Sequence, residues 1–311
     1  MAIQKKTIKE KISFDFKFNR ALLAMLLIPT AFIVVFSYMP IYGVQIAFRE
    51  YHPLRNMFDS QWVGLKYFIK FFTSYQWKEI TRNTLIISFY ELCTAPIPMI
   101  FAFLLTYLPS KRLRKSVQTV SFAPHFISTV VICGMLLQFL RADGGVINNI
   151  TGLFGMEAKN YMAYAQYYRR IYIWSGVWQS FGYSAILYIA ALTNASPELH
   201  EAAIIDGANI FKRILHIDWP CVVPTFCILL VLNCANILKS NSEKILLLQN
   251  NINLSVSETI STFTYRLSFD SPYPQYSYSA AVGMITSLVS MIILIIVNKA
   301  SKNLEDKYEW Q

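Results

Sequence analysis

Six long apolar runs dominate the chain, and they constrain its fold more than any other feature. A bilayer-spanning helix needs about 20 mostly apolar residues. The runs cover roughly residues 21–42, 83–108, 117–140, 171–193, 219–238 and 279–298. Hydrophobic residues make up 55% of the chain and charged residues 15%, against roughly 25% charged in a typical soluble domain. Because lipid offers the backbone no hydrogen-bond partners, these runs predict an all-α integral membrane protein with six transmembrane helices.

Lysine and arginine placement predicts the orientation of these helices. If the N-terminus is cytoplasmic, basic residues are nearly twice as dense in the loops on that side as in the opposite loops. The short segment Lys111–Lys115, KRLRK, carries much of the difference, as the positive-inside rule expects of short loops. Both termini and the loop 194–218 are therefore predicted to be cytoplasmic. The net charge of +10 is attributed to this topology, and no nucleic-acid partner is expected.

This topology divides the chain into three parts. They are a cytoplasmic tail over residues 1–20, a transmembrane domain over 21–300 and a cytoplasmic tail over 301–311. Prolines fall inside the second, third and fifth runs, where neighbouring helices can satisfy the carbonyls that they leave free.

Motifs that would indicate an enzyme are missing from the sequence. It contains no G-x-x-x-x-G-K-[ST], H-E-x-x-H or G-x-S-x-G pattern, which are signatures of phosphate binding, zinc proteases and serine hydrolases. The four histidines, at 52, 125, 200 and 216, are widely scattered. We therefore expect a non-catalytic chain with no metal site and no nucleotide hydrolysis of its own.

Polar and aromatic side chains inside the runs are candidates for a substrate pathway. An ionisable residue within a membrane span is a functional hypothesis by default, and aromatic rings beside amides suit sugars, which offer C–H faces and hydroxyls. The alternatives are an interfacial aromatic belt and polar contacts between helices. The candidates are Tyr90, Glu91, His125, Gln138, Trp174, Trp178, Gln179, Tyr183, Asn233 and Asn236.

A polar segment, ELHEAAIIDGANIFKRILHIDWP over residues 198–220, separates the fourth and fifth runs. Ser196 before Pro197 is typical of a helix start. The pattern predicts a short helix to about Asp206, with Gly207 in the left-handed position that follows a helix. A second short helix is expected from about Asn209, with an apolar stripe at 210, 211, 214 and 217 that could anchor it. Two helices around a glycine suggest a docking element; the alternative is a capped surface loop.

The same segment resembles the EAA loop of binding-protein-dependent ABC importer permeases. That loop has the pattern E-A-A, three residues, G, nine residues, I-x-L-P. Glu201-Ala202-Ala203, Gly207 and Ile217–Pro220 match it in spacing, with Trp219 in place of the usual leucine. Stretches such as WVGLKYF, SEKILLL at 242–248 and PQYSYSAAVGMITSLVSMIILIIVNKASK at 274–302 resemble the polysaccharide and oligosaccharide branch of the maltose-type permeases.

The resemblance implies a type I ABC importer permease fold in the bacterial cell membrane. It also implies three kinds of partner: a second homologous permease subunit, two ABC ATPase subunits that bind ATP and Mg, and an extracytoplasmic solute-binding protein. No cofactor is implied for this chain. The residues implied for coupling to the ATPase are Glu201, Ala202, Ala203, Asp206, Gly207 and Ala208.

Two alternatives remain open from the sequence. One is an importer permease for another solute, such as a peptide or an amino acid, because the EAA loop does not select a substrate. The other is a proton- or sodium-coupled carrier that acts alone, for which intramembrane ionisable residues and inverted repeats are typical.

Overall fold

The computed structural model describes residues 20–54, 56–239 and 241–308, with side chains to residue 304. Most of the predicted tail 1–20 lies outside the described residues. The described part of the chain is helical, and its one extended pairing is an isolated bridge between Arg49 and Trp62. The predicted all-α fold is therefore confirmed.

Regular α-helices make up most of the described chain. In order they are α2 (Arg20–Ile33), α3 (Lys66–Thr73), α4 (Trp77–Thr94), α5 (Ile97–Thr106), α6 (Lys111–Phe122), α7 (Thr129–Phe139), α8 (Val146–Gly152), α9 (Ala165–Leu192), α10 (Pro197–Ile205), α11 (Ile210–Arg213), α12 (Trp219–Asn236), α13 (Ser242–Leu248), α14 (Leu254–Ser257), α15 (Ile260–Phe269) and α16 (Tyr276–Tyr308). Shorter 3-10 and π turns link several of them, namely η1 (Val34–Tyr38), η2 (Met39–Phe48), η3 (Met57–Asp59), η4 (Ala123–Phe126), η5 (Tyr161–Ala163), η6 (Ile214–Asp218) and η7 (Ile237–Lys239).

Four helical stretches are long and apolar enough to cross a membrane. They are Arg20–Phe48, Trp77–Thr106, Ile210–Lys239 and Tyr276–Leu304, which contain the first, second, fifth and sixth predicted runs. The fourth predicted run falls within α9, which has 28 residues but is too rich in polar and aromatic side chains to join that group. The count of six spans therefore stays a prediction.

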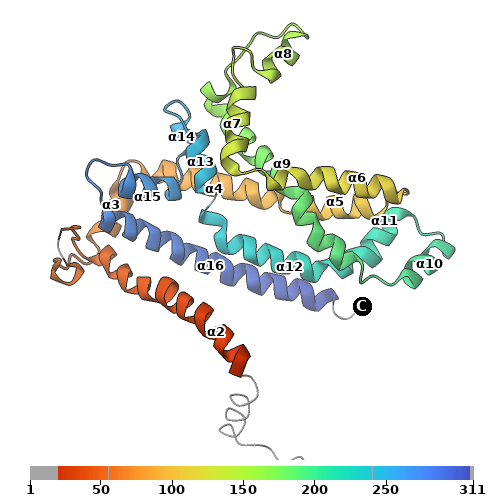
Figure 1. The fold of residues 1–311 in the computed structure, drawn as a ribbon, viewed down its shortest axis with the longest axis horizontal. Helices are drawn as coiled ribbons and strands as arrows, with labels where there is room; N and C mark the ends of the chain where they lie inside the picture. Colours follow the sequence, from red (N-terminus) through yellow and green to blue (C-terminus); the bar gives the residue numbers. More distant parts are fainter. Residues whose placement is uncertain (1–19, 55, 240, 309–311) are drawn as a thin grey trace, which may run out of the picture.

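The third predicted run is broken rather than straight. The helical stretches Lys111–Phe126 and Thr129–Phe139 meet at 97°. Pro124 has no N–H to continue the helix, and Ser128 starts a new one by accepting a hydrogen bond from the Val131 N–H at 3.3 Å. Figure 1 shows the consequence, because α7 points away from the long helices and carries α8 with it.

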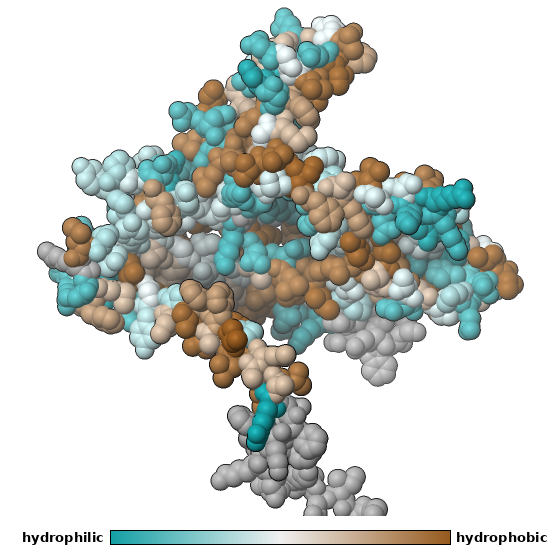
Figure 2. All heavy atoms as spheres, in the orientation of Figure 1, coloured by the Kyte–Doolittle hydropathy of each residue, from teal (hydrophilic) through white to brown (hydrophobic). Residues whose placement is uncertain are grey.

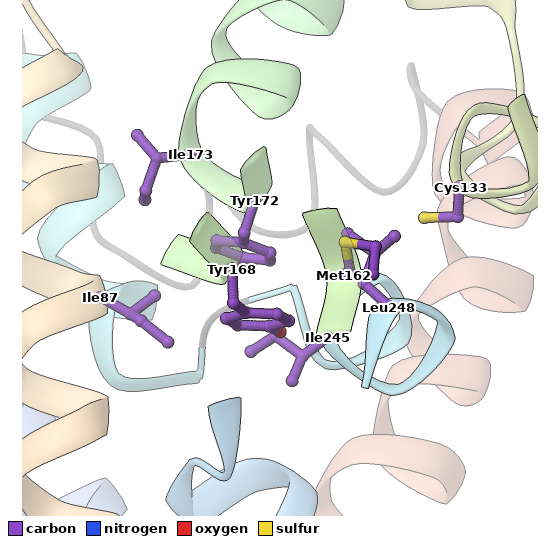
Figure 3. Packing of buried hydrophobic residues seen from close by; sticks show 8 residues of the cluster. All are labelled: Ile87, Cys133, Met162, Tyr168, Tyr172, Ile173, Ile245 and Leu248. Atoms are coloured by element: carbon purple, nitrogen blue, oxygen red, sulfur yellow. The ribbon is translucent and has the colours of Figure 1, made fainter. Parts of the chain in front are cut away.

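Two of the three buried clusters in the described part of the chain meet at α9. One joins α5, α9 and α12 through Ala102, Ala185 and Val222, all fully buried. The other joins α4, α9 and α13, and Figure 3 shows the Tyr168 and Tyr172 rings lying one above the other in it. Their centroids are 6.2 Å apart and their planes differ by 13°. Helix α9 contributes to both clusters and is the central element of the fold.

One close approach fixes the position of α9 against α6. A Cβ placed on Gly182 would lie 2.2 Å from the carbonyl oxygen of Ser121, which is well inside van der Waals contact. Only a residue without a side chain allows the two backbones to come this close, as is common between membrane helices.

The first span lies apart from this packing. None of the apolar window in Arg20–Phe48 is buried inside the chain, and Figure 2 shows α2 as a mostly hydrophobic rod that projects from the molecule. Such a surface needs lipid or another protein against it.

The molecule has two distinct ends. Figure 1 shows α10, the turn between α5 and α6 and the last turns of α16 at one end, with α3 and α15 at the other. Segments 109–116 and 194–218, which the charge pattern places on one side of the membrane, thus lie at the same end of the bundle.

Candidate functional site

A cavity of about 590 Å³ opens between α4, α5, α9, α12 and α13. Its lining mixes aliphatic side chains with hydrogen-bonding groups, a composition that suits a polar solute in a membrane protein. The titratable, amide and tyrosine side chains in the lining are Glu91, Tyr172, Gln179, Tyr183, Tyr188, Asn233, Asn236, Lys239, Asn241 and Lys244.

A network centred on Tyr172 forms one wall of the cavity. The Tyr172 hydroxyl donates to Glu91 Oε1 at 2.9 Å and accepts from the Asn241 N–H at 3.2 Å. Lys244 Nζ donates to the Tyr172 carbonyl at 2.9 Å and lies 5.2 Å from the centre of its ring. Four elements, α4, α9, α13 and the turn before α13, are therefore fixed to one another by one side chain and its backbone.

Lys244 is the charged group of this wall that lies outside the candidate spans. It is buried, with 3% of its surface exposed. Burial lowers the pKa of Lys244 to about 8, and the nearby Cys133 and Glu91 oppose that shift. Because desolvation disfavours the ammonium form, Lys244 loses its proton more readily than an exposed lysine does.

The opposite part of the wall joins α9 to the break between α6 and α7. Gln179 Nε2 donates to the Ile127 carbonyl at 3.1 Å. The His125 ring stacks on Tyr183 with centroids 3.8 Å apart and planes within 3°. The break is therefore tied to two side chains that face the cavity, so a movement of α6 or α7 would reshape it.

Half of the ten candidate pathway residues line the cavity. These are Glu91, Gln179, Tyr183, Asn233 and Asn236. His125 lies behind Tyr183, and Gln138 accepts a hydrogen bond from Arg141 at 3.2 Å at the far end of α7. Tyr90, Trp174 and Trp178 are exposed on the surface and do not line the cavity.

Five of the titratable, amide and tyrosine residues that line the cavity were not among the sequence candidates, namely Tyr172, Tyr188, Lys239, Asn241 and Lys244. Tyr172 sits at the start of the fourth run, where a tyrosine is expected at the membrane interface. The two lysines lie beyond the end of the fifth run, Lys239 on η7 and Lys244 on α13, and no local pattern indicates that the chain returns to the bundle there.

The segment 196–213 folds as predicted, into two short helices around Gly207. Gly207 has φ +75°. Its N–H bonds the Ile204 carbonyl at 3.0 Å, and the Ala208 N–H bonds the Ala203 carbonyl at 2.8 Å, which is the Schellman arrangement. Asn209 begins α11 by accepting from the Lys212 N–H at 2.9 Å. Ser196 occupies the N-cap position of α10, but its side chain makes no capping bond.

Helix α10 is largely exposed. It has no buried residue, Glu201 and Ala202 are exposed, and Ile205 is 86% exposed. The apolar stripe expected to anchor α11 is divided. Ile214 packs against the cluster of α5, α9 and α12, whereas Ile210 and Phe211 are exposed. Exposed Ile205, Ile210 and Phe211 therefore form an apolar surface in the same segment as the exposed Glu201, and this surface is open for contact with another molecule.

Comparisons with known proteins agree over most of the chain. Residues 95–305 match the profile of the family described as "Binding-protein-dependent transport system inner membrane component". The polygalacturonan/rhamnogalacturonan transport system permease protein YteP of Bacillus subtilis (strain 168) is 33% identical over 301 residues, which cover 96% of this chain and 93% of that protein. Protein LplB of the same organism is 33% identical over 287 residues, or 92% of this chain and 90% of that one.

A solved structure is similar in fold as well as in sequence. It is the crystal structure of a bacterial ABC transporter involved in the import of the acidic polysaccharide alginate, with a TM-score of 0.86 and 33% identity. The match covers 94% of this chain and 99% of the other. The family match spans more than half of the chain, and the two relatives span nearly all of it. This chain is therefore a member of the binding-protein-dependent transport system inner membrane component family.

Proposed function

We propose that this chain is a permease subunit of an ATP-driven ABC importer for oligo- or polysaccharides, and that it forms half of the translocation pathway. The observation that carries the proposal is the TM-score of 0.86 at 33% identity to an alginate importer chain over 94% of this chain. A relative similar over nearly its full length points the same way, since it is named for transport of polygalacturonan and rhamnogalacturonan.

The proposed assembly contains a second homologous permease, two ABC ATPase subunits and an extracytoplasmic solute-binding protein. The alginate importer has been solved with a periplasmic protein bound to an alginate pentasaccharide, which supports the last of these partners. The exposed apolar span Arg20–Phe48 supports a further membrane partner. ATP and Mg would be bound by the ATPase subunits, and this chain would carry no cofactor and perform no covalent chemistry.

The proposed topology places the α10 end of the bundle in the cytoplasm. Six spans over the predicted runs and two cytoplasmic termini fit the charge pattern of the loops. They also fit the shared position of α10, the α5–α6 turn and the last turns of α16.

The cavity is the proposed place of passage for the saccharide. Its amides and tyrosines can bond hydroxyls and stack on sugar rings, with Gln179, Asn233 and Tyr183 as the best placed. Lys239 also lines the cavity and is exposed, so its ammonium is available to a sugar carboxylate. That group favours an acidic saccharide, the class to which alginate belongs.

The segment around α10 is the proposed contact with the ATPase. Glu201 would make a charged contact, and Ala202 and Ala203 would let another surface approach closely. Asp206, Gly207 and Ala208 would form the turn that presents α10. The exposure of α10 and the left-handed Gly207 support these roles.

A reconstituted complex, purified through a tag on this chain, tests the proposal. We expect it to contain an ATPase pair and to take up oligogalacturonate or alginate oligosaccharides when its solute-binding protein and ATP are supplied. Glu201→Lys and Gly207→Pro should each abolish uptake while the chain stays in the membrane. Saccharide-stimulated ATP hydrolysis that survives both changes at normal levels would refute the coupling role of α10.

Two further outcomes separate the remaining alternatives. Uptake of peptides or amino acids, with no response to saccharides, would keep the importer and replace the substrate class. Transport by the purified single chain down a proton or sodium gradient would replace the importer with an ion-coupled carrier.

A further inference from the structure

A buried carboxylate lies where the α10 segment joins the bundle. Asp218 has 1% of its surface exposed. The Tyr107 hydroxyl, at the end of α5, donates to Asp218 Oδ2 at 2.6 Å. His200 Nε2, on α10, lies 3.3 Å from Asp218 Oδ1. Each carboxylate oxygen therefore has a partner on a different element. Both partners are distant from Asp218 in the sequence.

A π-turn places Asp218 in this position. The Trp219 N–H bonds the Ile214 carbonyl five residues earlier, and Pro220 then offers no N–H to the turn before it. A π-turn inserts an extra residue into a helix and is frequent at functional sites. It directs the Asp218 side chain inward, between α10 and α5.

The Tyr107 side of the contact is firmly held. Arg114 of α6 donates to the Thr106 and Leu108 carbonyls at 2.6 and 3.2 Å, on either side of Tyr107. The Arg213 guanidinium lies 5.2 Å from the centre of the Tyr107 ring. Tyr107 directly follows α5, which packs with α9 and α12 in one of the buried clusters.

The His200 side is loosely held, because α10 has no buried residue. The chain otherwise links α10 to the bundle at both of its ends, through residues 193–196 to α9 and through the Gly207 turn to α11. A buried carboxylate that loses a polar partner carries a large desolvation cost. A displacement of α10 is therefore resisted at Asp218 and reaches the end of α5 through the same carboxylate.

We propose that His200, Asp218 and Tyr107 form a joint that transmits movement of α10 to the transmembrane helices. The inference rests on the proposed function, and it names positioning residues rather than contacts to the saccharide or to ATP. In this proposal, α10 transmits force through the joint as well as through its backbone connections to α9 and α11.

The test uses the whole complex in proteoliposomes, with basal ATP hydrolysis, saccharide-stimulated hydrolysis and uptake measured together. His200→Leu removes the imidazole that pairs with Asp218 from the α10 side. We expect uptake per ATP hydrolysed to fall about tenfold, as for a buried polar group that loses its partner, while basal hydrolysis stays unchanged. His200→Gln restores a side-chain N–H donor and should recover uptake to within about twofold of the wild type.

Two further variants make the result specific. His216→Gln removes an exposed histidine from the same segment, whose ring contacts only the Lys212 carbonyl at 2.9 Å among described residues, and should behave as wild type. Asp218→Leu combined with His200→Leu should lose no more uptake than Asp218→Leu alone, because residues that act through one contact are not additive.

The outcomes separate the joint from the proposed function. A wild-type complex that does not respond to any saccharide overturns the proposed function and the joint with it. If the wild-type complex responds to saccharide, any of three results overturns the joint alone. These are normal coupling in His200→Leu, a loss in His200→Gln as large as in His200→Leu, and losses of the two leucine variants that multiply in the double variant.

Discussion

Two glycines show how differently the two functional regions of this chain are built. Gly207 in the α10 segment has φ +75°, and a Cβ placed on it would meet nothing within 4 Å. Gly182 in α9, beside the cavity, has an ordinary helical backbone, and a Cβ there would collide with the Ser121 carbonyl. Gly207 allows the left-handed turn in which it lies. Gly182 allows a close contact between two helices that are far apart in the sequence.

The difference separates local from tertiary determinants. A left-handed turn is a property of a few neighbouring residues, so its substitution should change the direction of α10 and leave the bundle intact. A close approach between α9 and α6 is a property of the whole bundle, so its substitution should change assembly.

The largest effect is expected at Gly182. Gly182→Val forces α9 away from α6 and should destabilise the chain by about 3 kcal/mol, at the upper end for overpacked sites. The yield of folded complex and its melting temperature should both fall. Gly283→Ala in α16 is the matched control, since a Cβ there would meet nothing within 4 Å. An unchanged melting temperature for Gly182→Val would mean that the two helices are not in contact in the membrane.

A smaller and different effect is expected at Gly207. Gly207→Val puts a β-branched residue in the left-handed region, at a cost of roughly 1–2 kcal/mol, and the turn should relax to another conformation. Saccharide-stimulated hydrolysis should drop severalfold while the melting temperature stays near that of the wild type. Gly207→Asn should retain most activity, because asparagine tolerates this conformation. Equal losses for valine and asparagine would contradict a purely conformational role.

The same distinction explains what the sequence could reveal. The bounds of α10, its glycine C-terminus and the Asn209 cap follow from residues within a few positions of one another, and all could be predicted. The network of Tyr172 with Glu91 and Lys244 joins positions 81 and 72 residues apart, and no local pattern indicates it. Ser196 occupies the predicted N-cap position, but its side chain makes no capping bond; Pro197 at the first helical position also favours a helix start there.

Burial of Lys244 gives the cavity wall a pH dependence. Its pKa is lowered to about 8 in the folded chain, below its ordinary value, so the unfolded chain binds the proton more tightly. Stability should therefore rise with pH above about 8, on the order of 1–2 kcal/mol by pH 9.5. The comparison is the melting temperature of wild type minus that of Lys244→Met, which should increase between pH 7.5 and 9.5. A difference that is constant or decreases would show that Lys244 is solvated in the complex.

The smallest effect is expected at Asn209, which caps α11 directly after the Gly207 turn. Asn209→Ala removes the acceptor for the Lys212 N–H and should cost about 1 kcal/mol of local helix stability. Because Ile214 and Trp219 still pack against the bundle, this cost should appear as fraying of a four-residue helix and not as a lower melting temperature. Saccharide-stimulated hydrolysis should change by less than about twofold, and Asn209→Ser should be indistinguishable from wild type because serine supplies an equivalent acceptor. A loss for Asn209→Ala as large as that for Gly207→Val would mean that α11 itself transmits the movement. Local and tertiary determinants could then not be separated in this region.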